Sequence, residues 1–296
     1  MWQARHVRDQ LQTHYPALAI EVIGIRTEAD KFLNLSLDQM GGKGAFVKEL
    51  EQALLNDSAD LAVHSMKDVT LDLPLPLALP VIMQREDARD VLISNTYPGL
   101  EQLPAGARVG TSSLRRQCQL RALRPDLEIL DIRGNVGTRL KKLDAGKYDA
   151  LILAAAGIKR LGLQDQIKQF LETDVLLPAI GQGALGLETR SDDQALIEMI
   201  SVLNDAVTQT CVTAERSLNR KLNGGCHAPV AAYAEAQGRE LTLRALVGRV
   251  DGSELLRAAV TGPMALAESL GATLGQQLLD RGAGDILREP DHGAHN

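Results

Sequence analysis

The sequence predicts an α/β protein whose last third is a smaller α+β domain. Two observations support the first part: helical patterns alternate with short apolar strands over residues 1–155, and polar or basic residues follow the ends of those strands. The third observation is a change of period near Pro229, where strands of alternating polar and apolar residues begin. A chain of 296 residues is long enough for one to three domains with a sizeable core.

The first region begins with a helical pattern and contains two short apolar runs. The expected elements are a helix over residues 1–13 and strands over residues 18–25 and 60–64. The second strand runs into the polar segment His64-Ser65-Met66-Lys67-Asp68. Pro74, Pro76 and Pro80 then punctuate an extended stretch, which we interpret as a crossing to the next region.

The second region repeats the alternation of strand and helix. Its expected strands cover residues 107–110, 127–132 and 148–155, with helices over residues 114–123 and up to residue 143. Ligands bind beyond the carboxyl ends of strands in open parallel sheets, and helix N-termini there favour anions. Arg115 and Arg116 lie in a first helical turn, where they oppose the helix dipole unless an anion compensates them. The alternative is a Ser113 N-cap with solvated arginines.

The third region is predicted from its period-two pattern. The expected strands cover residues 230–235, 240–247 and 254–260, followed by a helix over residues 263–279. Gln237-Gly238 and Asp251-Gly252 separate these strands and are typical hairpin turns.

Composition excludes several functional classes. A formal charge of −6 and an aromatic content of 3% argue against a general nucleic-acid binder. Cys118, Cys211 and Cys226 are too few for a disulfide framework or a zinc site, so no metal is expected, and the first two lie in helical patterns and are interpreted as structural. The start is not a signal peptide and no apolar run has membrane-spanning length, which favours a cytoplasmic protein.

Two other residues, Cys226 and Asp68, could carry chemistry, whereas His64 and the segment around Lys43 have plainer interpretations. The glycines before Cys226 leave a thiol accessible, although a lone cysteine is about as often an inert packed residue. Asp68, after Lys67, is either half of a surface ion pair or an acid that stabilises a developing cation. His64 ends an apolar strand and is interpreted as a packed histidine. The glycine-rich segment around Lys43 lacks the spacing of a nucleotide-binding loop.

Six motifs in this order resemble one family, the porphobilinogen deaminases, also called hydroxymethylbilane synthases. The resemblance runs from near Trp2 to the final helix. The motifs are Gly41-Gly42-Lys43-Gly44, His64-Ser65-Met66-Lys67-Asp68, Gly110 to Arg116, Arg133 to Arg139, Pro178-Ala179-Ile180-Gly181-Gln182-Gly183-Ala184 and Gly224-Gly225-Cys226.

This resemblance implies two doubly wound, periplasmic-binding-protein-like domains and a third, small α+β domain. The expected boundaries are residues 1–83 plus 184–202, 88–178 and 205–296. It implies a transferase of tetrapyrrole (haem and porphyrin) biosynthesis that joins four porphobilinogen molecules head to tail into hydroxymethylbilane and releases ammonia. A monomer that binds neither nucleic acid nor membrane is expected.

The resemblance also assigns roles to residues. The product grows on a dipyrromethane cofactor held by a thioether that maps to Cys226, and the catalytic carboxylate maps to Asp68. Every pyrrole carries an acetate and a propionate, so cationic side chains are expected around it. The cofactor-binding positions match Lys67, Ser113, Arg115, Arg116 and Arg133, and the substrate-binding positions match Lys43, Arg139, Arg160 and Gln182.

The sequence departs from the family pattern at its start. A strand carrying Arg-x-Ser is expected before Trp2 and is not in the sequence, which suggests an N-terminally truncated form with impaired solubility and activity. Ala29 stands where the family prefers glycine, and Gln39 where lysine is common. The alternatives to an active transferase are an impaired truncated form and a non-catalytic anion-binding module.

Overall fold

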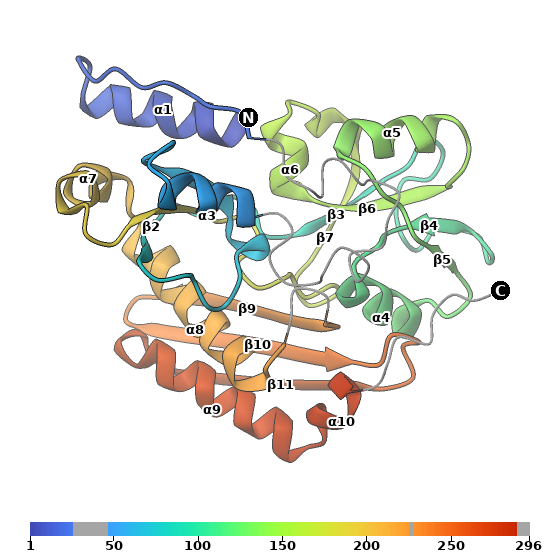
Figure 1. Ribbon diagram of the computed structural model, residues 1–296. Helices are drawn as coiled ribbons and strands as arrows, with labels where there is room; N and C mark the ends of the chain where they lie inside the picture. Colours follow the sequence, from blue (N-terminus) through green and yellow to red (C-terminus); the bar gives the residue numbers. More distant parts are fainter. Residues whose placement is uncertain (26–46, 225–227, 289–296) are drawn as a thin grey trace. The chain divides into compact units, whose positions relative to one another are not determined.

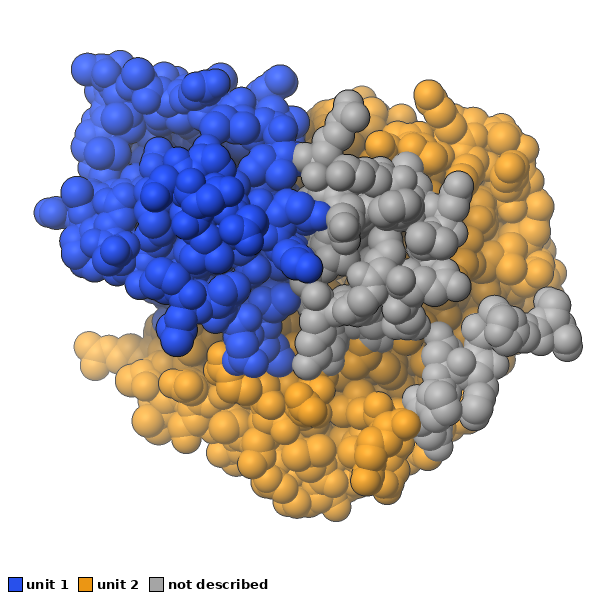
Figure 2. Space-filling model, in the orientation of Figure 1, with its two compact units in different colours: residues 1–86, 184–210 blue, residues 87–183, 211–296 orange. Residues whose placement is uncertain are grey.

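The computed structural model describes residues 1–25, 47–224 and 228–288 and is a mixed α/β structure, as predicted (Figure 1). Contacts between Cα atoms divide the chain into two compact units, coloured separately in Figure 2. Unit 1 comprises residues 1–86 and 184–210, and unit 2 comprises residues 87–183 and 211–296. The predicted division into three domains, with separate bodies at residues 88–178 and 205–296, stays a prediction.

Unit 1 is built on a three-stranded antiparallel sheet of order β1-β8-β2. The predicted first helix is confirmed as α1, and its Val7 and Leu11, one turn apart, are buried in a cluster with residues of β2 and β8. The elements are α1 (Trp2–His14), α3 (Lys48–Leu55), β1 (Ala62–Ser65), the 3₁₀ turn η1 (Met66–Asp68), β2 (Leu77–Ile82), β8 (Leu185–Arg190), α7 (Gln194–Ile200), η3 (Ser201–Leu203) and the beginning of α8 (Ala206–Leu222).

Two predictions for unit 1 are wrong. Residues 18–25 do not form a strand, because no described segment pairs with their backbone and Ile23 is half exposed. The proline-punctuated stretch is not a crossing but contains β2, which pairs with β8. A shift of register between Ala78 and Val81 accommodates Pro80, which has no N–H group to give to a ladder.

The first part of unit 2 is a five-stranded mixed sheet of order β5-β4-β6-β3-β7. The strands β4, β5 and β6 are parallel, and β3 is antiparallel to both of its neighbours. Separate apolar clusters include alternate residues of β3, with Leu92 in one and Val91 and Ile93 in the other. The elements are β3 (Asp90–Ile93), β4 (Arg108–Gly110), α4 (Leu114–Leu123), β5 (Glu128–Leu130), α5 (Val136–Asp144), β6 (Ala150–Ala154), α6 (Ala155–Arg160), η2 (Gln164–Gln166) and β7 (Ile167–Leu171).

The rest of unit 2 is an antiparallel sheet of order β11-β10-β9 covered by helices (Figure 1). The three predicted strands and the long helix are confirmed, and residues of α8, α9 and α10 share one core with the sheet. The elements are β9 (Val230–Gln237), β10 (Glu240–Gly248), β11 (Leu255–Pro263), η4 (Met264–Leu266), α9 (Ala267–Asp280) and α10 (Ala283–Arg288).

Helix α4 packs against this second sheet. Cys118 lies in a small apolar cluster with Leu246 of β10, and Arg121 Nη1 donates to the backbone oxygen of Val250 at 2.8 Å. Burial raises the pKa of the Cys118 thiol to about 11, which makes it unreactive and agrees with a structural role. Gly252, at φ +79°, lies where a Cβ atom would come within 2.6 Å of the Ala122 backbone nitrogen, so the β10–β11 turn fits closely onto α4. Among the described residues, no helix is long and apolar enough to cross a membrane.

Candidate functional site

The N-terminus of α4 is held by the loops around it. Gly110 ends β4, and a Cβ atom there would come within 2.7 Å of the Leu151 side chain, so the strand can approach its neighbour only without one. Ser112 Oγ donates to the backbone oxygen of Ile132 at 2.6 Å and accepts from its N–H at 3.1 Å. These bonds join the loop before α4 to the loop that carries Arg133. Ser113 is the N-cap residue, but its hydroxyl makes no capping bond.

Arg115 and Arg116 are not solvated, which contradicts the plainer interpretation of this motif. Only 4% and 6% of their surfaces are exposed. Both bind the carboxylate of Asp90, which is fully buried at the start of β3: Arg115 Nη1 lies 2.8 Å from Oδ2, and Arg116 Nη2 lies 2.6 Å from Oδ1. Each guanidinium also donates to a backbone oxygen, that of Leu177 for Arg115 and that of Ile152 for Arg116.

This cluster of Asp90, Arg115 and Arg116 carries one excess positive charge in a buried place. The two guanidinium groups hold the pKa of Asp90 far below its usual range despite burial, so the carboxylate stays ionised. Burial is the main cause that lowers the pKa of Arg115, and arginine nevertheless stays protonated in proteins. The buried Nε atoms of both arginines have no hydrogen-bond partner among the described residues. Two orphan donors beside an uncompensated cation fit an anion.

Gln182 belongs to the same network. Its Nε2 donates to Asp90 Oδ1 at 2.9 Å and to the backbone oxygen of Ala88 at 2.6 Å. Both neighbours are acceptors, so the amide nitrogen must face them, and Oε1 is left without a partner in the described part of the chain. The preceding N–H, that of Gly181, donates to Glu215 of α8 at 2.7 Å, and the same carboxylate accepts from the Ala234 N–H. The Gln182 loop is therefore fixed from two sides.

The other arginines of the predicted site lie at the ends of α5 and α6. Asn135 caps α5 by accepting from the Thr138 N–H at 2.9 Å. Arg139, in the first turn of α5, donates from Nε to the backbone oxygen of Gly134, and no described carboxylate pairs with it. Burial and the charge of Arg116 lower the pKa of Arg139, which places it in the same electrostatic environment as the cluster. Arg160 ends α6 and donates to the backbone oxygen of Gly183 at 2.9 Å.

Lys67 and Asp68 lie in unit 1, whereas the arginines lie in unit 2. Both residues belong to η1, directly after β1, and Asp68 is exposed. The strand before them is anchored by His64, which is 4% exposed and lies 2.7 Å from Glu188 Oε2 of β8. The prediction of a packed histidine is therefore confirmed. Cys226 and Lys43 lie outside the described residues.

Sequence reasoning missed the acidic residues of the site. Asp90 begins a strand of apolar residues, Asp90-Val-Leu-Ile, and a charge at that position was the available signal. Glu215 sits inside a helical pattern with other polar residues, so nothing in the sequence distinguished it. No group of three described His, Cys, Asp or Glu residues could hold a metal ion.

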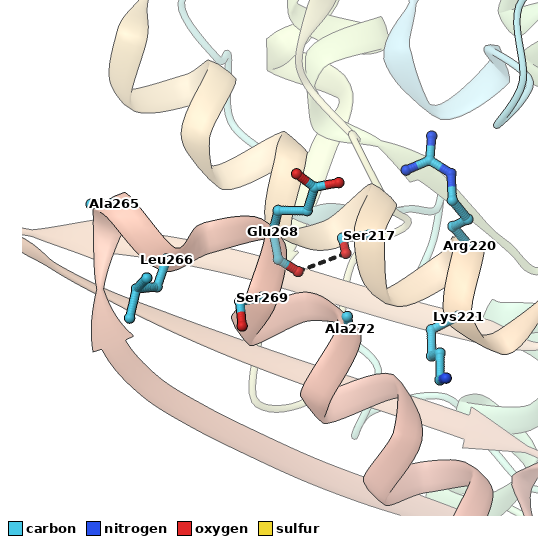
Figure 3. A pocket seen from close by; sticks show the side chains of 8 residues that line it. All are labelled: Ser217, Arg220, Lys221, Ala265, Leu266, Glu268, Ser269 and Ala272. Atoms are coloured by element: carbon cyan, nitrogen blue, oxygen red, sulfur yellow. Dashed lines mark hydrogen bonds between the residues drawn. The ribbon is translucent and has the colours of Figure 1, made fainter.

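A separate cavity of about 650 Å³ lies between α8 and the start of α9, and none of the predicted site residues that the structure describes lines it (Figure 3). Ser217 donates to the backbone oxygen of Glu268 in its wall, and the side chains of Arg220 and Lys221 point apart. It is lined by Ser217, Arg220, Lys221, Ala265, Leu266, Glu268, Ser269 and Ala272. It is open, and no cluster of like groups converges in it, so the arginine cluster is the stronger candidate.

Comparison with known families tests the resemblance that the sequence motifs suggested. The family model described as "Porphobilinogen deaminase, dipyromethane cofactor binding domain" matches residues 1–198, and the one described as "Porphobilinogen deaminase, C-terminal domain" matches residues 209–280. The chain belongs to the porphobilinogen deaminase family. This membership confirms the resemblance and places the protein in tetrapyrrole biosynthesis.

Solved structures similar to this porphobilinogen deaminase family member include three bacterial binding domains. A periplasmic substrate-binding protein of an ABC transporter from Coxiella burnetii is 13% identical over 72% of this chain and 92% of its own, with a TM-score of 0.43. A nutrient binding protein from Burkholderia cenocepacia bound to methionine is 12% identical over 66% and 85%, at 0.42. The BvgS periplasmic VFT2 domain from Bordetella pertussis is 16% identical over 73% and 82%, at 0.41. Similarities this distant add nothing to the assignment.

The matched cofactor-binding domain can be tested against the residues of this chain. Dipyrromethane of this family carries acetate and propionate groups, which require fixed cations. The cluster of Asp90, Arg115 and Arg116 supplies excess positive charge and two orphan N–H donors, and Arg139 adds a further cation with no described carboxylate partner. The residues present therefore fit the group.

Proposed function

We propose that this protein is a hydroxymethylbilane synthase: it joins four porphobilinogen molecules head to tail, releases four molecules of ammonia and adds one water when the product leaves. The observation that carries the proposal is the buried arginine pair with one carboxylate between two cations, in a chain of this family. Such a site suits a substrate whose every ring bears two carboxylates.

Cys226 is proposed to attach the dipyrromethane cofactor through its sulfur. When bound, the cofactor supplies the terminal pyrrole to which porphobilinogen is added. Arg115, Arg116 and Arg133 are proposed to bind its carboxylates, and Lys67 and Ser113 to complete that contact. Because two parallel hydrogen bonds can join a guanidinium and a carboxylate, the arginines would fix orientation as well as charge.

Asp68 is proposed as the catalytic carboxylate. Departure of ammonia from a porphobilinogen leaves a cationic pyrrole, and a carboxylate close to the pyrrole nitrogens stabilises that charge and can carry a proton. Lys43, Arg139, Arg160 and Gln182 are proposed to bind the substrate and the growing chain, and the three cationic side chains would do so through the acetate and propionate groups. Gln182 Oε1 would accept a hydrogen bond from a pyrrole N–H, because this buried oxygen has no hydrogen-bond partner among the described residues.

Mass spectrometry of the purified chain tests the attachment. We expect the intact mass to exceed the sequence mass by that of a dipyrromethane, and peptide mapping to place the addition on Cys226. Cys226→Ser should abolish it, whereas the buried Cys211→Ser is a matched control that should retain it. An unmodified mass in the native chain would favour a non-catalytic anion-binding module instead.

Asp68→Asn tests the catalytic role, because it removes the charge and keeps the shape. Loss of one preorganised electrostatic partner typically lowers turnover by ~10²–10³. We expect that loss in hydroxymethylbilane formation while the dipyrromethane content stays normal. Asp72→Asn, at an exposed position four residues further along the chain, is the control and should change the rate less than about twofold. A rate in Asp68→Asn above about a third of the native rate would contradict the assignment.

A further inference from the structure

We propose that Asp90 is the positioning residue of the anion site: its carboxylate sets the orientation of Arg115 and Arg116 and thereby aims their free donors at an incoming anion. The inference rests on the proposed function for the identity of that anion. Neither the sequence motifs nor the family match singles out Asp90.

The position of Asp90 suits this role because its backbone is held on both sides. It is the first residue of β3, which pairs with β6 and with β7, and its Cα faces those of Ala154 and Leu171. A carboxylate on a central strand moves little, and a site built on such an element is more exact than one built on a loop.

The hydrogen bonds show what Asp90 does to the arginines. Its two oxygens take one donor from Arg115, one from Arg116 and one from Gln182. Arg115 uses Nη1 for Asp90 and for the Leu177 oxygen, and Arg116 uses Nη2 for Asp90 and Nη1 for the Ile152 oxygen. The Nε atom of each is buried and has no described partner. The same carboxylate thus separates two like charges and decides which of their donors remain free.

Asp90 also sets the charge of the site. With it the cluster is +1, and without it the cluster would be +2 and would attract anions more strongly on charge alone. Positioning predicts the opposite result, because guanidinium groups that lose their shared anchor repel each other and turn toward other acceptors. The sign of the change in anion affinity therefore separates the two roles.

The sign of this change in affinity can be measured as porphobilinogen binding to the Cys226→Ser chain, in which no cofactor is attached. We expect Asp90→Asn to raise the dissociation constant at least tenfold at constant ionic strength, measured by calorimetry. An unchanged or lower dissociation constant would overturn the proposal. Ile93→Ala is the control for lost stability. Ile93 lies on the same strand as Asp90, and its side chain is buried in the apolar cluster that also contains Val91. An equal weakening in that variant, at equal loss of thermal stability, would also overturn it.

A second pair of variants serves if the buried +2 charge prevents Asp90→Asn from folding. Arg115→Met leaves Arg116 with Asp90 at zero net charge, and Arg115→Met combined with Asp90→Asn restores the native +1. Charge alone predicts that the added change tightens porphobilinogen binding. Positioning predicts that it weakens binding at least threefold, because Arg116 loses its anchor. Tighter binding in the double variant refutes the positioning role.

Arginine Nε–H signals in nitrogen-15 NMR test Asp90 without any ligand. We expect slowly exchanging signals for Arg115 and Arg116, assigned by their methionine variants, and loss of slow exchange in Asp90→Asn. If the Cys226→Ser chain with Asp90 unchanged binds no porphobilinogen while these signals behave as expected, the proposed function fails and the positioning role stands. If binding is normal and the signals persist in Asp90→Asn, the positioning role fails alone.

Discussion

The two units each bury a small cluster of charges, and the clusters have opposite composition. In unit 2, one carboxylate, Asp90, lies between two guanidinium groups. In unit 1, the imidazole of His64 lies 2.7 Å from Glu188, and the charge of Glu51 also acts on this pair. Each cluster holds buried atoms of its majority charge with no described partner: the arginine Nε atoms in unit 2 and Glu188 Oε1 in unit 1.

The difference lies in how each cluster can relieve its excess charge. Arginine keeps its proton, so the excess in unit 2 is permanent and calls for an anion. Carboxylates and imidazole exchange protons, and burial together with the charge of Glu188 raises the pKa of Glu51. Protonation of Glu51 can therefore remove excess negative charge from the unit 1 cluster without a bound ligand. The same kind of burial thus indicates a binding site in one unit and a structural anchor in the other.

The largest expected effect comes from removing a cation of the unit 2 cluster. Arg115→Ala or Arg116→Ala leaves Asp90 with one guanidinium, so the cluster has no excess positive charge with which to bind an anion. We expect covalent dipyrromethane to fall from nearly complete to almost absent, measured as the modified fraction by intact mass.

Arg121→Ala is the matched control for this loss. Arg121 lies on the same helix but donates to the backbone oxygen of Val250 and to Gln117 rather than to Asp90. Its modified fraction should equal that of the native chain. Normal modification in both cluster variants would show that the excess charge does not serve the cofactor.

The next effect compares the two central carboxylates. Asp90→Ala leaves two buried guanidinium groups that cannot lose their protons, and breaking such a pair typically costs about 3–5 kcal/mol of the free energy of unfolding. Glu188→Ala leaves the buried imidazole of His64 without its hydrogen-bond partner, so we expect about 1–3 kcal/mol, the cost of an unsatisfied buried group. Urea unfolding at pH 7 measures both. A larger loss in Glu188→Ala would reverse the comparison.

Much of the fold and of the cationic part of the site could be predicted from the sequence. The α4 boundaries, Leu114–Leu123, match the prediction, although the hydroxyl of the N-cap residue Ser113 makes no capping bond. The place of Arg115 and Arg116 in a first helical turn, against the helix dipole, also indicated that they need an anion. The strand predicted at residues 18–25 failed, because an apolar run becomes a strand only when another backbone pairs with it.

The partner of the arginines could not be predicted, for a physical reason. Asp90 is 25 residues before Arg115 in the chain and meets it only through the order of strands in the sheet. Gln182 enters the same network from 92 residues beyond Asp90. Local patterns report periodicity and caps, whereas these contacts depend on which strands become neighbours. In the sequence, such a contact is indicated only by a single acidic residue at the start of an apolar strand.

The smallest expected effect concerns Glu51, and its sign follows from the direction of its pKa. Because the folded state raises this pKa, the folded state binds the proton more tightly than the unfolded one. The resulting stability is fully present below the ordinary glutamate pKa of about 4.3 and is lost as pH rises through the folded value.

Glu51→Gln mimics the protonated form, so it should match the native chain near pH 4 and be more stable at pH 7. The gain is about 1.4 kcal/mol for each unit by which the two pKa values differ. Urea unfolding of both chains from pH 4 to pH 8 checks this. Parallel stability curves would mean that the proton on Glu51 does not contribute to the stability of the folded state, which would contradict the prediction.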